Sequence, residues 1–378
     1  MKLRETFARP LRLGLIGGGP DSWIGAMHRG AATMDGWFDL TAGVFSSDAA
    51  RSRAAGAALG LDAARSYGDL AEMLRAEAAR DDPIDAVAIM TPNDMHHGYA
   101  AAALDAGLDV ISDKPVSETF AQACDLLRRT RERSRLFAIV HGYSAYPMTR
   151  YARRLVHEGA LGAIRLVQVE YIQSGMATRV EDGAQTNRLR WVLDPSRSGL
   201  ALVMSAIGCH AHHLACHVTG AAVTRVVADV STLLPQRQLI DHVSALLEFD
   251  NGARGNFTVT QAAAGGENDI RLRVYGEKGM LDWSHRSASY LTIAMQGEPA
   301  RTVGRGDAFL PPEGLREAFA NIYAELAQDR MARAMGQTPP ALPYPRIEEG
   351  AHTMAFIEAC LASHAAGRWE DVAPLPGR

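Results

Sequence analysis

The chain is poor in cysteine, and its few cysteines do not form a disulfide pattern. Only four occur in 378 residues, at positions 124, 209, 216 and 360, and only one pair is close in sequence. Small secreted domains that depend on disulfides are far denser in cysteine. We therefore expect a chain that folds around its own hydrophobic core in a reducing compartment, the cytoplasm.

Long apolar runs and an excess of positive charge are also missing. No run reaches the about 18 apolar residues that a membrane span needs, and the first ten residues, MKLRETFARP, lack the apolar centre of a signal peptide. The 39 basic and 43 acidic residues leave a net charge of −4. Binding to nucleic acid or to an anionic membrane favours a basic surface. The sequence therefore predicts no nucleic-acid partner and no membrane partner.

A glycine-rich turn follows the first apolar segment. The stretch 11–16 is apolar without a helical period, and Gly17, Gly18 and Gly19 end it before a helix-compatible segment near Gly25. Glycines at such a strand-to-helix turn let the backbone approach a pyrophosphate, which the helix N-terminus also attracts. The spacing departs from G-x-G-x-x-G by about three extra residues. An ordinary loop therefore stays open as an alternative on this motif alone.

Strand and helix patterns alternate from residue 11 to residue 140. Buried strands are expected at 11–16, 38–45, 84–90, 108–112 and 136–140, and helices at 48–59, 67–80, 95–106 and 119–133. This alternation indicates a doubly wound parallel sheet, which binds its ligand at the carboxyl ends of its strands. The candidate residues at these ends are Gly17, Thr91, Asn93, Lys114 and His141.

The tip of the second strand bears on the choice of cofactor. An acidic residue there hydrogen-bonds the ribose of NAD, and a basic one accepts the 2′-phosphate of NADP. The tip carries Ser46 and Ser47, and Asp48 is better explained as a helix N-cap. We favour NAD because neither tip position is basic, although Arg51 lies one helical turn on and NADP is not excluded.

The pattern changes after residue 143. A helix is expected at 147–158, and strands at 164–172, 223–232, 243–249, 253–262, 270–275 and 279–283, with helices at 315–333 and 348–364. The turn Asp250-Asn251-Gly252 indicates a hairpin. The sequence predicts an α/β fold with an N-terminal Rossmann domain (1–142) and a C-terminal α+β domain (143–378) with a large, mostly antiparallel sheet.

Five motifs in this order resemble the glucose-fructose oxidoreductase, inositol dehydrogenase and MocA family of NAD(P)-dependent sugar and polyol oxidoreductases. The resemblance covers nearly the whole chain. Its carriers are GGGPDSWIG at 17–25, TPN at 91–93 followed by His96, SDKP at 112–115, IGCH at 207–210 and VYGEKG at 274–279. WVLDPSRSG at 191–199 and the glycine insertion with Pro20 resemble the scyllo-inositol, L-glucose and levoglucosan dehydrogenase branch.

The resemblance implies an oxidoreductase that moves a hydride between a ring hydroxyl of a sugar, anhydrosugar or cyclitol and NAD. It assigns a cofactor role to Gly17, Gly18, Gly19, Ile24, Ser46, Ser47, Thr91, Pro92, Asn93, His96, Asp113 and Lys114. It assigns a substrate role to Lys114, Tyr143, Arg188, Trp191, His210 and His213. Aromatic packing for the tyrosine and tryptophan, a surface ion pair for the arginine and packing for His213 remain the alternatives.

Lys114 and His210 are the expected catalytic pair. A lysine at a strand end beside the nicotinamide stabilises the developing alkoxide, and an imidazole that titrates near neutrality suits a general base. The family resemblance assigns His210 the role of base and Lys114 that of its partner.

One position departs from the family. The aspartate that stands four residues before the histidine, in D-x-G-x-H, is Ala206 here. Without that carboxylate the imidazole is less basic and the lysine lacks a partner. The chain is then a weakened enzyme, a natural variant with another proton path, or an engineered inactive form. Ala206 also keeps open a second hypothesis, a non-catalytic NAD(P)-binding sensor of the same fold.

The histidine-rich segment IGCHAHHLACHVTG also raises the possibility of a metal site. His210, His213 and His217 share one helical face, with Cys209 and Cys216 near. No H-E-x-x-H pattern is present, and the dehydrogenase hypothesis already uses His210. We therefore expect no metal.

The predicted second domain has a broad sheet that needs cover on both faces. The two C-terminal helices, at 315–333 and 348–364, are too few to cover both. The sequence therefore predicts a homodimer or homotetramer with closed symmetry.

Overall fold

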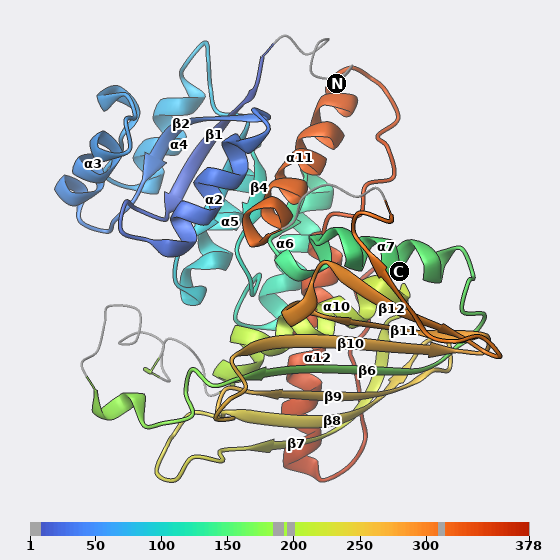
Figure 1. Ribbon diagram of the computed structural model, residues 1–378. Helices are drawn as coiled ribbons and strands as arrows, with labels where there is room; N and C mark the ends of the chain where they lie inside the picture. The colour runs from blue at the N-terminus through green and yellow to red at the C-terminus, as the bar shows by residue number, and fades with distance from the viewer. Residues whose placement is uncertain (1–8, 184–192, 195–200, 309–313, 378) are drawn as a thin grey trace. The chain divides into compact units, whose positions relative to one another are not determined.

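The computed structural model describes residues 9–183, 193–194, 201–308 and 314–377 (Figure 1). The chain divides into two compact units. The first comprises Met1–Ser117, Ala121–Ala145 and Gly314–Glu348, and the second comprises Glu118–Phe120, Tyr146–Glu313 and Glu349–Arg378. The sequence predicted a boundary between residues 142 and 143. In the structure the chain passes from the first unit to the second after Ala145, three residues later. The first unit, however, also takes in a C-terminal segment that was expected in the second.

The first unit is built on a five-stranded parallel sheet, as predicted. Its strands are β1 (Leu11–Gly17), β2 (Phe38–Val44), β3 (Ala86–Met90), β4 (Asp109–Ser112) and β5 (Phe137–Ile139), in the order β2-β1-β3-β4-β5. The strand order reverses between β1 and β3. Ligands of doubly wound sheets bind outside the carboxyl ends of the strands at such a switch point.

Among the described residues, six α-helices accompany this sheet. They are α2 (Trp23–Met34), α3 (Ala49–Ala58), α4 (Leu70–Ala78), α5 (His96–Asp105), α6 (Phe120–Glu132) and α11 (Leu315–Ala334). Side chains of Ser22, Asp48 and Asp69 cap α2, α3 and α4 by accepting a backbone N–H three residues on. Asp48 is therefore an N-cap, as expected. Helix α11 packs against α2, which is why its segment belongs to the first unit.

The second unit contains a nine-stranded sheet. Its strands are β6 (Ile164–Gln173), β7 (Val223–Ser231), β8 (His242–Phe249), β9 (Arg254–Thr260), β10 (Asn268–Gly276), β11 (Gly279–Ser284), β12 (Tyr290–Met295), β13 (Arg301–Gly304) and β14 (Glu370–Asp371). The order is β13-β12-β11-β10-β6-β9-β8-β7-β14. Every pairing is antiparallel except β6 with β9, so the predicted mostly antiparallel sheet is confirmed.

Helices cover one face of this sheet (Figure 1). They are α7 (Pro147–His157), the π-helical turn η5 (Met204–Gly208), α10 (Cys209–Thr219) and α12 (Ile347–Ala366). Strand β8 shows the two faces clearly: Val243, Leu247 and Phe249 are buried, whereas Leu246 is 49% exposed. Alternate residues of a strand point to opposite faces, so Leu246 lies on the face that the described helices leave open.

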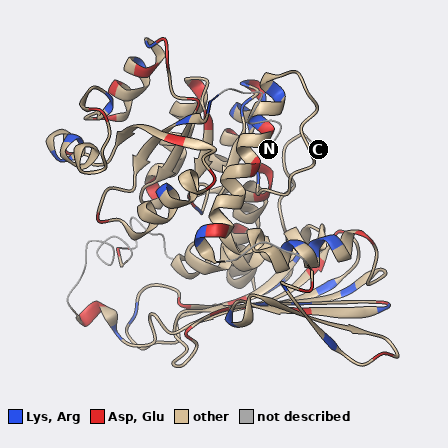
Figure 2. Cartoon of the chain, turned by 45° about the horizontal axis from the view of Figure 1, so that its top comes forward, with Lys and Arg blue, Asp and Glu red and all other residues tan. Residues whose placement is uncertain are grey.

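In the view of Figure 2, basic and acidic residues are interspersed along the described helices and strands. Many form short ion pairs within one helix, such as Arg129 with Asp125 and Arg128 with Glu132 on α6. In the part of the chain that the structure describes, no helix is both long and apolar enough to cross a bilayer.

A buried histidine on α2 makes the fold sensitive to acid. His28 has 0% exposure, its Nδ1 lies 2.8 Å from the Tyr323 hydroxyl, and burial lowers its pKa to about 4. The unfolded chain binds a proton at His28 below about pH 6.5, whereas the folded chain does not until about pH 4. Stability is therefore lost as the pH falls through this window, by about 1.4 kcal/mol per pH unit for this group.

We expect the His28→Gln variant to lose this contribution to the pH dependence. The measurement is the free energy of urea unfolding at pH 7.0, 6.0 and 5.0, with His364→Gln, a partly exposed histidine on α12, as the control. An unchanged slope in His28→Gln would contradict the assignment.

Candidate functional site

The glycine turn after β1 is held by contacts that exclude side chains. Gly17 and Gly18 have φ of 80° and 67°, which favour glycine. A Cβ on Gly17 would lie 2.6 Å from the Met90 carbonyl oxygen, and one on Gly25 would lie 2.3 Å from that of Gly18. Gly25 therefore lets the start of α2 rest on the turn, the role of the third glycine in the standard motif. The longer spacing preserves that contact.

Gly19 differs from its neighbours because the fold does not require it. Its φ is not positive, and a Cβ there would meet only Phe45 Cβ, at 3.9 Å. The turn therefore has open space at Gly19, beside the first turn of α2, which carries Ser22 as its cap and Ile24. A pyrophosphate fits such a place, because the backbone is bare and the helix N-terminus is positive.

The TPN turn lies on the other side of the switch point. Met90 pairs with Gly17 across β3 and β1, so Thr91, Pro92 and Asn93 begin beside the glycine turn. Thr91 Oγ1 is buried and has no hydrogen-bond partner among the described residues. An orphaned hydroxyl at the carboxyl end of a central strand is suited to hydrogen-bond a ligand. The first unit therefore has a cradle that fits a dinucleotide.

Lys114 stands on a braced turn after β4. The Asp113 N–H donates to the Ile89 carbonyl, at 3.0 Å, and the Lys114 N–H donates to Asp113 Oδ1, at 2.8 Å. Lys114 is one of only three lysines in a chain whose 39 basic residues are otherwise arginines. Lys114 thus places a primary amine at the carboxyl end of a strand next to the switch point.

His96 ties the two turns together. It is 1% exposed, its Nδ1 lies 2.6 Å from the Pro115 carbonyl oxygen and its Nε2 lies 2.9 Å from that of Thr91. Both ring nitrogens thus face backbone carbonyls. We assign His96 a positioning role: it holds the TPN turn and the Lys114 turn in register.

The tip of β2 brings a cation to the expected ribose position. Asp48 accepts the Arg51 N–H at 2.7 Å, and Arg51 Nε donates to Ser46 Oγ at 2.9 Å. Ser46 is therefore occupied by a guanidinium, and Ser47 is exposed beside it. The sequence placed Arg51 one turn away from the tip, whereas the structure places its side chain at the tip.

In the second unit, His210 follows a π-helical turn. The Cys209 N–H donates to the Met204 carbonyl, five residues back, and such π-turns are frequent at functional sites. Within residues 203–210 only Ser205, Ala206 and His210 are partly exposed. Ala206 and His210 therefore share the open side of this segment, as the position of the missing aspartate requires.

Tyr171 is a residue that the sequence did not point to. The centroids of its ring and the His210 ring are 6.4 Å apart, and its hydroxyl donates to Asn268 Oδ1 at 2.8 Å. Tyr171 on β6 and Asn268 on β10 thus form a polar group beside the candidate base. The signal lies in the strand pairing of β6 with β10, which a single sequence does not give.

His213 lies in a buried polar cluster with His217, Glu349 and Arg153. The two imidazole rings stack at 5.2 Å, and each has a nitrogen 3.3–3.4 Å from Glu349 Oε1. Burial alone would raise the pKa of Glu349, but its histidine contacts hold the pKa well below the ordinary value. Burial lowers the pKa of His217 to about 4. Because His213 is only 2% exposed, the structure favours packing over direct substrate contact.

The remaining predicted substrate residues are placed as follows. Tyr143 lies in the short helix η3 (Gly142–Ala145) of the first unit and is 7% exposed, so it offers little surface to a ligand. Arg188 and Trp191 fall outside the described residues.

Comparison with known proteins agrees with both units. Residues 11–141 match the family described as "Oxidoreductase family, NAD-binding Rossmann fold", and residues 149–282 match the "GFO/IDH/MocA C-terminal domain". An uncharacterized oxidoreductase of Bacillus subtilis, YfiI, is 31% identical over 95% of this chain and 96% of its own length.

Two further relatives have a named function or a bound ligand. Levoglucosan dehydrogenase of Pseudarthrobacter phenanthrenivorans is 26% identical over 68% of this chain and 71% of its own. A crystal structure of an inositol dehydrogenase homolog from Azotobacter vinelandii, complexed with NADH and myo-inositol, superposes with a TM-score of 0.88. It is 31% identical, and the match covers 96% of this chain and 98% of that one.

Proposed function

The chain belongs to the GFO/IDH/MocA family of oxidoreductases, and on that premise we propose that it is an NAD-dependent dehydrogenase acting on a ring hydroxyl of a sugar, anhydrosugar or cyclitol. The observation that carries the proposal is Lys114 on its braced turn beside the dinucleotide cradle. A nucleotide-binding module alone needs no amine at that place. The named relatives, one acting on levoglucosan and one crystallised with myo-inositol, support the substrate class.

The chemistry assigns one task to each unit. When bound, the nicotinamide ring accepts a hydride from the carbinol carbon. The Lys114 ammonium donates a hydrogen bond to the hydroxyl oxygen and stabilises the negative charge that develops there. His210 Nδ1 or Nε2, when unprotonated, takes the hydroxyl proton. Tyr171, packed beside His210 and fixed by Asn268, limits the positions that the imidazole adopts.

The test is direct. The purified protein is incubated with NAD and a panel of inositols, pyranoses and anhydrosugars, and NADH formation is followed by absorbance. We expect turnover of at least one ring alcohol. If calorimetry shows no binding of either nicotinamide cofactor, the proposal fails.

A second function is favoured by one observation. Ala206 packs with the apolar cluster of Met176, Leu202 and Leu239, so the position of the missing aspartate has apolar surroundings. A non-catalytic NAD(P)-binding sensor of the same fold has no need of a carboxylate there and would tolerate an alanine with apolar neighbours. Cofactor binding without turnover of any ring alcohol would favour the sensor, and even slow turnover would exclude it.

We expect NAD to bind more tightly than NADP, with Arg51 setting how much NADP is tolerated. Its guanidinium already lies at Ser46, within reach of a 2′-phosphate. Arg51→Ala should weaken NADP binding about tenfold, because a charge-assisted hydrogen bond is lost, and should leave the NAD dissociation constant within about twofold. Calorimetric titration of both cofactors measures this. A lower dissociation constant for NADP than for NAD in the unchanged protein would overturn the preference.

We also propose that two or more copies assemble through the open face of the nine-stranded sheet. Exposed Leu246 lies there, together with the cross-strand ion pair between Arg271 and Asp282. Apolar residues on a sheet face without helices are suited to pack on another copy. Light scattering at micromolar concentration should give a dimer or tetramer, and Leu246→Glu should lower that mass, whereas Leu233→Glu in a loop should not. A monomeric mass for the unchanged protein would contradict the proposal.

A further inference from the structure

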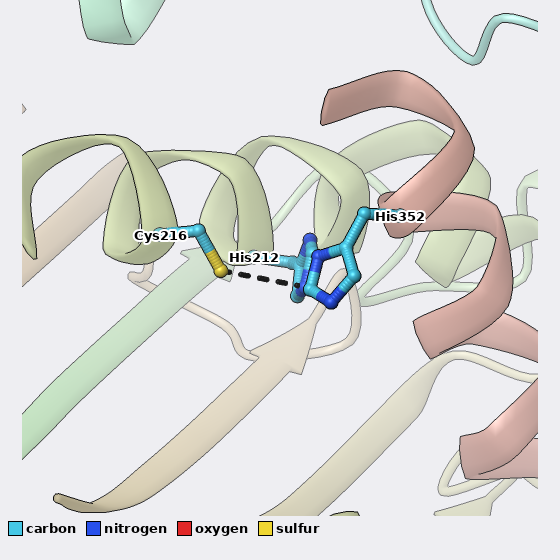
Figure 3. Close-up of side chains that lie close together, drawn as sticks. All are labelled: His212, Cys216 and His352. Carbon is cyan, nitrogen blue, oxygen red and sulfur yellow. Dashed lines mark hydrogen bonds between the residues drawn. The ribbon is translucent and has the colours of Figure 1, made fainter. Parts of the chain in front are cut away.

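Three side chains with metal-binding atoms converge between α10 and α12, on the helix-covered side of the second unit. His212 and Cys216 are one turn apart on α10, and His352 reaches them from α12 (Figure 3). Each residue offers one ligand atom, and these atoms all lie within 4.8 Å of one another. His212 is only 2% exposed, and Cys216 and His352 are partly buried.

The hydrogen bonds around His212 determine which of its ring nitrogens carries no hydrogen. Thr353 Oγ1 donates its only hydrogen to the Glu349 carbonyl, at 2.9 Å. The 3.0 Å contact between Thr353 Oγ1 and His212 Nδ1 must then have Nδ1–H as the donor. His212 Nε2 is therefore unprotonated, and its lone pair lies on the side of Cys216, 3.6 Å from Sγ.

The same argument applies to His352. Its Nε2 lies 3.0 Å from the Val223 carbonyl oxygen, which only accepts, so Nε2 donates the hydrogen and, in the neutral ring, Nδ1 is the unprotonated nitrogen. Histidine ligands of metals usually donate their second N–H to an oxygen in this way, which fixes the ring and its tautomer. Both histidines here have that arrangement.

We propose that His212 Nε2, Cys216 Sγ and His352 Nδ1 bind a Zn²⁺ ion. Zinc takes sulfur at about 2.3 Å and imidazole nitrogen at about 2.0–2.1 Å in tetrahedral geometry, which places sulfur and nitrogen about 3.6 Å apart. The Sγ–Nε2 distance already has this value. Binding releases the thiol proton of Cys216 to solvent, so that a thiolate and two neutral imidazoles face the ion.

The ion would cross-link elements of the second unit. It would join α10, α12 and, through Val223, the start of β7. Within the described residues no fourth His, Cys, Asp or Glu completes the group, so a water would take the fourth position. His210 and His212 are two residues apart on a helix and point to different sides. A zinc ion bound by His212 would therefore not be bound by His210, the candidate base.

The neighbouring cluster of His213, His217 and Glu349 is the weaker candidate. Its three ligand atoms are also close together, but Arg153 donates to the His217 carbonyl, and its charge acts on Glu349. A guanidinium at that place already balances the carboxylate and repels a second cation. The proposal therefore rests on the Cys216 group alone.

The test uses the full-length protein, stripped with a chelator and titrated with Zn²⁺ and, separately, with Co²⁺. We expect one zinc per chain by elemental analysis after gel filtration, and a thiolate-to-cobalt charge-transfer band with the intense visible bands of tetrahedral cobalt. Saturation with zinc should raise the Tm by about 5 to 10 °C. Cys216→Ser should abolish the charge-transfer band and weaken zinc binding at least tenfold.

Two matched variants show which group binds. Cys360→Ala removes a buried cysteine on α12 that is outside the group, and it should retain the cobalt spectrum. His352→Gln should lose zinc binding while circular dichroism shows that it is folded. The absence of stoichiometric zinc, or zinc binding that Cys216→Ser leaves unchanged and His217→Phe removes, would overturn the proposal.

Discussion

Lys114→Met is expected to lower kcat/KM for the best ring alcohol by about 10² to 10³, the usual cost of losing one donor to a developing oxyanion. Methionine has a similar length and keeps the packing of the stem, so the loss reports the ammonium. The turn itself is held by backbone groups of Asp113 and Ile89 and by His96 on Pro115. The NAD dissociation constant should therefore change little. Steady-state rates and calorimetry measure the two effects.

The matched control is Lys278→Met, because Lys278 is a lysine in the turn between β10 and β11. It should leave the rate within about twofold. If the Lys114→Met protein has full kcat/KM, Lys114 takes no part in the reaction. A protein with normal kcat and a weaker NAD affinity would show that Lys114 binds the cofactor and does not stabilise the alkoxide.

Local patterns were sufficient to predict most of the secondary structure. The apolar runs at 11–16 and 84–90 became the neighbouring strands β1 and β3, and Asp250-Asn251-Gly252 became the β8–β9 hairpin turn with Gly252 at a φ of 85°. These features depend on residues that are close in sequence. The strands β12, β13 and β14 were missed; β13 and β14 are only four and two residues long, too short for an alternation to show.

Contacts between segments that are distant in sequence could not be predicted from the sequence. The apolar residues of α11 lie nearly all round the helix, which indicates that it is buried. Their pattern does not show that α11 packs on α2 and not on the large sheet. The i, i+4 spacing put His212 and Cys216 on one face of α10, whereas His352 joins them from 136 residues further on. Tyr171 beside His210 depends in the same way on how the chain folds back.

The partners of the histidines explain why the metal hypothesis looked weak from the sequence. A metal-binding histidine usually has a second group that fixes its tautomer. The spacing of HAHHLACH does not show that Thr353 and Val223 are such groups. The sequence argument grouped His210 with His213 and His217 by helical face. The structure separates them, since His210 is partly exposed beside Tyr171 and the other two are buried with Glu349.

Ala206→Asp is expected to raise kcat on the best ring alcohol at least about tenfold. Ala206 and His210 lie on the same partly exposed side of the π-turn and α10, so a carboxylate at 206 lies one turn before the imidazole. It would raise the basicity of His210 and orient the ring, and general-base steps contribute about 10² to 10⁴ in rate. The cofactor cradle belongs to the first unit, so NAD affinity should not change.

The apolar neighbours of Ala206 set the conditions of the test. Contact with Met176, Leu202 and Leu239 disfavours an ionised side chain and raises its pKa, so the gain should increase with pH over the range 6 to 10. Ala206→Asn is the matched control: it has the same shape and polarity without the charge, and it should not gain activity. Urea unfolding of all three proteins separates a loss of folded protein from a loss of catalysis. A kcat in the aspartate variant that is unchanged or lower would mean that alanine belongs to a working site with a different proton path.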